Sequence, residues 1–142
     1  MSVNGGSGGS DLSSIHWAVV DNDIPMVRRF VELGENINKR TKSNGYSPLH
    51  LAAKWNNDLA MMKALLELGA DVHVRDSGGW TPLHWAAKES LNPAIVEALL
   101  EAGADHRAET KSGRTALDLI EENDALKNTE ARWKLNDLSY KK

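Results

Sequence analysis

The chain alternates short apolar segments that fit one face of a helix with polar stretches that contain glycine. One segment has the i, i+1, i+4, i+5 spacing of a one-faced helix, at Ile95, Val96, Leu99 and Leu100. A shorter helix is predicted at 82–88, because Thr81 can cap it and Pro82 suits its first position. Gly103 follows the second helix where a left-handed residue is favoured. The pattern predicts helix, turn and helix, joined to the next unit by a tight glycine-containing hairpin.

This unit recurs along the chain. SPLHLAA at 47–53 and TPLHWAA at 81–87 lie 34 residues apart, and the segments at 13–19 and 115–121 fall into the same register. A second motif lies in each gap and contains Gly34, Gly69 or Gly103. A single unit of this kind cannot bury its own apolar face, so the units must stack on one another.

The Thr-Pro-Leu-His-x-Ala-Ala and Gly-Ala-Asp motifs at this period resemble ankyrin repeats. The resemblance covers about 11–135 and implies an all-α solenoid of helix-turn-helix units with projecting β-hairpin loops. Four repeats are expected, at approximately 11–41, 42–76, 77–110 and 111–142. The first unit lacks Thr-Pro, and the fourth has Ala116 and Asp118 in place of proline and histidine, as suits capping units. Residues 1–10, rich in Gly and Ser, are expected to form a flexible tail or linker.

Composition narrows the functional classes. The chain has no cysteine, which excludes thiolate metal sites and cysteine nucleophiles. Its net charge of −3 gives no electrostatic reason to expect a nucleic acid or a membrane surface as partner. No apolar stretch is long enough to span a bilayer, and the N-terminus lacks the pattern of a secretion signal. We expect a cytoplasmic monomer, with nuclear localisation or delivery into a host cell left open.

Three histidines occupy the same position of successive units: His16, His50 and His84. Equivalent residues of stacked units lie about one helix-packing distance apart, roughly 8–10 Å, which is too far to share one metal ion. The resemblance implies instead that each histidine bonds to the backbone of the neighbouring turn. We expect no metal site.

No catalytic arrangement emerges from the remaining polar residues. Ser13, His16 and Asp21 have the residue types of a hydrolytic triad, but nothing nearby predicts an oxyanion hole. The carboxylates at Asp118 and 121–122 are expected to be solvated charge on the last unit. No glycine-rich phosphate loop is present. We therefore expect neither enzymatic activity nor a cofactor.

The five tryptophans fall into two groups. Trp17 and Trp85 follow the motif histidine, a position that we expect to face the core between the helices, and Trp133 is expected to pack in the last unit. Trp80 precedes Thr81 on a hairpin arm and is expected to point into the concave face, which hairpins and first helices form together. Trp55 is expected at the solvent end of its helix.

We expect the concave face to bind another protein, because exposed large aromatics and arginines dominate protein interfaces. The expected anchors are Tyr46, Trp55 and Trp80, flanked by the basic residues Arg40, Lys54, Arg75, Lys88 and Arg114. These charges favour an acidic or mixed partner surface. The alternative is that Trp80 merely covers its own hairpin.

The biological setting of such a module stays open. The chain is interpreted as a free-standing adaptor, as a regulatory or targeting domain excised from a larger protein or enzyme, or as an engineered binder. The GGSGGS segment suggests an engineered or excised binding domain, and the two capping units are expected to favour this or a free-standing adaptor over the regulatory domain of an enzyme. The second and third units carry one extra residue between their helices, which argues against a consensus design built from one identical unit.

Overall fold

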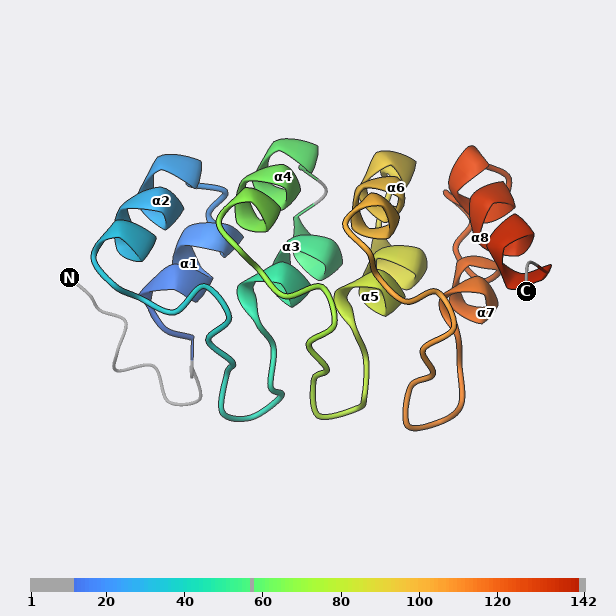
Figure 1. Cartoon of the computed structure of the whole chain (residues 1–142), viewed down its shortest axis with the longest axis horizontal. Helices are drawn as coiled ribbons and strands as arrows, with labels where there is room; N and C mark the ends of the chain where they lie inside the picture. Colours follow the sequence, from blue (N-terminus) through green and yellow to red (C-terminus); the bar gives the residue numbers. More distant parts are fainter. Residues whose placement is uncertain (1–11, 57, 141–142) are drawn as a thin grey trace.

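The computed structural model describes residues 12–56 and 58–140, so the predicted tail at 1–10 lies outside the described residues. Helices lie in two rows along the molecule, and loops between successive helix pairs project from one edge (Figure 1). The inner row, beside the loops, consists of α1 (Ser14–Val20), α3 (Pro48–Trp55), α5 (Pro82–Glu89) and α7 (Ala116–Ile120). The outer row consists of α2 (Ile24–Glu32), α4 (Leu59–Glu67), α6 (Pro93–Glu101) and α8 (Glu130–Tyr140). The part of the chain that is described contains helices and no strand, which confirms the all-α solenoid.

Each inner helix begins with a capping box. At α5 the Thr81 hydroxyl accepts a hydrogen bond from the backbone N–H of His84, while the backbone N–H of Thr81 donates to Nδ1 of His84 over 2.9 Å. In the last unit Asp118 takes the histidine's place, because its carboxylate accepts a hydrogen bond of 2.9 Å from the backbone N–H of Thr115. Satisfying both donors at the helix start stabilises helices that are otherwise too short to form alone.

The motif histidines also tie each unit to the next hairpin. Because Nδ1 accepts a bond from the cap N–H, the proton lies on Nε2, which donates to a backbone carbonyl. His16 donates to Lys39 over 2.7 Å, His50 to Trp80 over 2.8 Å and His84 to Ala108 over 2.9 Å. All three side chains are buried, and the predicted structural role is confirmed. Burial lowers the pKa of His50 and of His84.

The hairpins are hydrogen-bonded turns that also bond to one another. The backbone N–H of Ser77 donates to the Asn44 carbonyl over 2.8 Å, and that of Lys111 donates to the Gly78 carbonyl over 3.0 Å. Gly79, with a φ of +79°, sits at this junction, and a Cβ there would lie 2.9 Å from the backbone nitrogen of Lys111. Only glycine fits both the conformation and the close approach.

One apolar core runs through the stack between the two rows. Its largest fully buried side chains include Leu49, Leu51, Met61, Met62, Leu65, Leu83, Ile95, Leu99 and Leu119. Among the described helices, none is both long and apolar enough to cross a membrane. Over the same residues, no group of three or more His, Asp or Glu side chains is arranged to hold a metal ion.

The expectation that Trp17 faces the core and that Trp133 packs in the last unit is wrong, whereas Trp85 packs against the core but is only partly buried. Trp17 is 39% exposed, Trp133 is 59% exposed and Trp85 is half-buried. The repeat position of Trp17 and Trp85 is filled in other units by Leu51 and Leu119, which are fully buried. The position therefore lies at the border of the core, and an indole is large enough to extend from it to the surface. Trp133 points away from the buried face of α8, which consists of Ala131 and Leu135.

Candidate functional site

Four aromatic side chains of the second and third units gather where the inner helices meet the hairpin arms, the face that was expected to be concave and is called the concave face below. We call Tyr46, Trp55, Trp80 and Trp85 the aromatic cluster. The ring centroids of Trp80 and Trp85 lie 4.2 Å apart, and Tyr46 meets Trp85 at 6.0 Å and Trp55 at 6.4 Å, both edge-on. The structure thus brings together the three predicted aromatic anchors and adds Trp85, which sequence analysis assigned to the core.

A buried carboxylate holds the aromatic cluster in place. The indole Nε1 of Trp85 donates to Oδ2 of Asp76 over 2.8 Å, and Oδ1 of Asp76 accepts from the backbone N–H groups of Gly78 and Trp80, each over 2.9 Å. Asp76 therefore links the hairpin turn to α5. Burial raises the pKa of the Tyr46 hydroxyl, and the charge of Asp76 adds to this shift. Asp76 was not among the predicted site residues, although an aspartate ahead of Ser-Gly-Gly is typical of a turn.

Lys54 lies against the aromatic cluster. Its Nζ is 3.9 Å from the centroid of the Trp85 ring and 5.8 Å from that of Trp55. At such distances an ammonium group is attracted to the ring face. Lys54 forms no ion pair with a carboxylate in the described part of the chain. The ammonium group of Lys54 therefore contacts aromatic rings, and no carboxylate of the described residues pairs with it.

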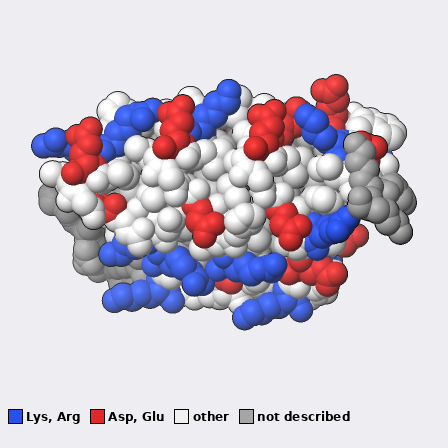
Figure 2. Space-filling view, in the orientation of Figure 1, with Lys and Arg blue, Asp and Glu red and all other residues white. Residues whose placement is uncertain are grey.

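Two predicted arginines brace the hairpins. Nε of Arg40 donates to the Gly45 carbonyl over 3.1 Å. One guanidinium nitrogen of Arg75 donates to the carbonyls of Gly79 and Glu109, over 3.0 and 2.8 Å. Both side chains are exposed, and neither forms an ion pair with a carboxylate of the described residues. Figure 2 shows lysine and arginine side chains gathered in a band over the hairpins.

The other two predicted basic residues are partly neutralised within the chain. The Arg114 guanidinium pairs with the Glu122 carboxylate, and Nζ of Lys88 lies 4.0 Å from the same group. Glu122 follows α7, so these two residues belong to a charge network at the last inner helix. Of the five predicted basic residues, Lys54, Arg40 and Arg75 are therefore those that form no ion pair with a carboxylate of the described residues.

Sequence similarity to known proteins identifies the family of the chain. A family model of ankyrin repeats matches residues 15–110 and 56–128. The chain belongs to the ankyrin repeat family. Mouse ankyrin repeat and SOCS box protein 6 is 39% identical over 64 residues, which is 45% of this chain and 15% of that protein. The human protein of the same name is 38% identical over the same length.

The chain also matches a second kind of relative, of which it covers a smaller fraction. The mouse nuclear factor NF-kappa-B p105 subunit is 35% identical over 66 residues, 46% of this chain and 7% of that protein. This ankyrin chain therefore spans a small part of the relatives that it matches. Ankyrin repeats are generally protein–protein interaction modules and typically lack catalytic activity.

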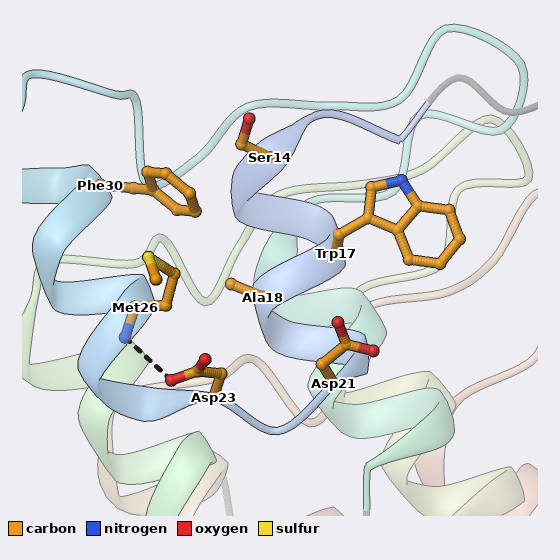
Figure 3. Close-up of a pocket in the computed structure, with 7 residues that line it drawn as sticks. All are labelled: Ser14, Trp17, Ala18, Asp21, Asp23, Met26 and Phe30. Carbon is orange, nitrogen blue, oxygen red and sulfur yellow. Dashed lines mark hydrogen bonds between the residues drawn. The ribbon is translucent and has the colours of Figure 1, made fainter. Parts of the chain in front are cut away.

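The ankyrin stack also has a pocket of about 560 Å³ at its N-terminal end, which sequence analysis did not predict. Figure 3 shows Met26 and Phe30 of α2 directed toward α1, where Ala18 lies between them and Trp17. Met61 and Leu65 occupy the positions of Met26 and Phe30 in the second repeat and are fully buried there. The pocket therefore lies on the face of the first repeat that faces away from the second, where no other described residue packs on Met26 as the neighbouring repeat packs on Met61.

Proposed function

We propose that this ankyrin domain binds another protein through its concave face and hairpins, and that it does so without catalysis. The observation that carries the proposal is the aromatic cluster, in which side chains of two consecutive repeats meet at one surface. Trp55 is 52% exposed, and Tyr46, Trp80 and Trp85 are half-buried. Anchored aromatic side chains with accessible faces are typical of the residues that contribute most to protein binding.

Hydrogen bonds and ring contacts support this role, because they fix the anchors before a partner arrives. Trp85 is held by Asp76, and the Trp80 ring contacts that of Trp85 at a tilt of 31°, with 4.2 Å between the centroids. Side chains that are already ordered lose little conformational freedom on binding. A partner therefore meets a rigid apolar surface rather than mobile side chains.

The test compares two exposed tryptophans in different repeats. Immobilised wild-type, Trp55→Ala and Trp133→Ala proteins are incubated with extract of the source cells, and bound proteins are quantified by mass spectrometry. We expect a partner whose recovery falls with Trp55→Ala and not with Trp133→Ala, since losing an anchor costs about 2 kcal/mol, roughly thirtyfold in affinity. Equal recovery on all three proteins would contradict binding through the aromatic cluster.

The setting of the domain belongs to the same proposal. We propose an adaptor-type monomer that acts in the cytoplasm and contacts protein rather than nucleic acid or a membrane surface. The matched relatives, of which the chain spans 15% or less, favour a second candidate, a regulatory or targeting domain of a larger protein. Light scattering measures the oligomeric state, and the length of the reading frame separates the two candidates.

A further inference from the structure

We infer that the aromatic cluster binds a partner segment that presents acidic side chains next to an apolar one. This inference rests on the proposed function and adds the chemistry of the partner. Its basis is the combination, on one face, of exposed aromatic surface with positive charge that the described residues leave unneutralised. Lys54, Arg40 and Arg75 supply that charge.

The position of Lys54 decides the sign of the charge that the aromatic cluster accepts. Aromatic faces attract cations, but Lys54 already places its Nζ 3.9 Å from the Trp85 ring. A cation of the partner at the same rings would face this ammonium group, and like charges at close range repel. A carboxylate, in contrast, can pair with the ammonium group, because opposite charges at close range attract.

The negative charge of Asp76 does not make the aromatic cluster favour a cation of the partner over an anion. Its carboxylate is 7% exposed and accepts hydrogen bonds from Trp85, Gly78 and Trp80. Because both of its oxygens are occupied by donors of the same chain, Asp76 has little capacity left to bind a cation of a partner. The accessible charge beside the aromatic cluster is therefore that of the basic residues.

The apolar part of the segment is expected on Trp55 and Trp80. Trp55 is 52% exposed at the end of α3, on one side of Tyr46, and Trp80 lies on the hairpin arm before α5. An apolar side chain placed here would exclude water from the neighbouring charge pair, and such exclusion strengthens the pair. Arg40 and Arg75, held on hairpin carbonyls, would contact acidic residues further along the segment.

Selection from a random peptide library tests the chemistry directly. The library displays peptides of about twelve residues, roughly 40 Å when extended, and the full-length domain is the target. We expect enrichment of Asp and Glu flanking Leu, Phe or Trp, and binding that weakens when salt rises from about 0.15 to about 0.5 M. Basic or uncharged consensus peptides, or no enriched sequence, would overturn the inference.

Matched variants separate this inference from the proposed function. Lys54→Gln should weaken an enriched acidic peptide about three- to tenfold, whereas Lys63→Gln on the outer helix α4 should leave its affinity unchanged. Trp55→Ala should weaken it at least tenfold, with Trp133→Ala as the control. If the affinity of the enriched peptides falls with Trp55→Ala but not with Lys54→Gln, the inference of an acidic partner is wrong and the proposal of binding through the concave face still holds. If Trp55→Ala leaves the affinity of the enriched peptides unchanged, both the acidic partner and binding through the concave face are contradicted.

Discussion

The ammonium group of Lys54 lies 3.9 Å from the centre of the Trp85 ring and so joins helix α3 of one repeat to helix α5 of the next. The contact crosses a repeat boundary at the edge of the apolar core, against which Trp85 packs. It also explains why two residues with separate predicted roles, a flanking charge and a core side chain, belong to one site.

A double-mutant cycle should measure this contact. Lys54→Met keeps most of the side-chain volume, and Trp85→Leu introduces the residue found at the equivalent position 51. We expect a coupling of about 0.5–1 kcal/mol in the free energy of unfolding, measured with urea. Additivity of the two single changes would show that the ring and the ammonium group do not interact in solution.

Asp76→Ala should destabilise the fold by about 1–3 kcal/mol, because it leaves the indole N–H of Trp85 and two backbone N–H groups without their acceptor. Denaturant unfolding measures the loss. Asp71→Ala is the control, since Asp71 is exposed and accepts from a single local backbone N–H group, that of His73. A loss no larger than that of the control contradicts the assigned role of Asp76.

His84→Ala should lower the free energy of unfolding by about 1–3 kcal/mol, because the carbonyl of Ala108 and the backbone N–H of Thr81 lose their partner. Each histidine serves its own turn, so His50→Ala should have a similar and independent effect. Stoichiometric zinc in the purified protein, lost on these substitutions, would refute the structural assignment.

Stability should fall when the solution is acidified from pH 7.5 to 5.5. Burial lowers the pKa of His50 and His84, so the unfolded chain, with an ordinary histidine pKa of about 6.5, binds protons that the folded chain does not. Stability is therefore greatest above the unfolded pKa, declines as pH falls through it and levels off below the folded values. Urea midpoints across this range measure the decline, and His84→Gln should reduce its slope. An unchanged slope in that variant would show that His84 does not contribute.

The repeat period made much of the fold predictable. Because equivalent residues recur at 34-residue spacing, the caps, the glycine ends and the histidine bonds of one unit could be inferred for its neighbours. The repeat period did not predict what fraction of a side chain at the border of the core is exposed to solvent. Leu51 and Trp85 are equivalent, yet the leucine is fully buried while the indole reaches the surface.

The site was predictable only where the motif fixed the position of a residue. Tyr46 and Trp80 precede the helix cap in consecutive units, so their common surface followed from the register. The pairing of Lys88 and Arg114 with Glu122 could not be inferred, because it joins side chains of different helices whose rotamers the motif does not specify. Trp133 lies in a helix that departs from the repeat pattern, so no register was available for it.

Two of the bonds between hairpins join backbone atoms alone, from Ser77 to Asn44 and from Lys111 to Gly78, and the side chain of Arg75 adds a bond to the Glu109 carbonyl. Apart from the glycine at 79, which the close approach requires, and Arg75, which bonds to the next hairpin, the exposed hairpin side chains can change without breaking these backbone bonds. Random substitution at positions 44, 77 and 111 by residues other than proline, which would remove the donor N–H at 77 or 111, should therefore leave the spacing of the hairpins intact. Natural variation can therefore replace exposed hairpin side chains that contact a partner without changing the backbone arrangement of the hairpins.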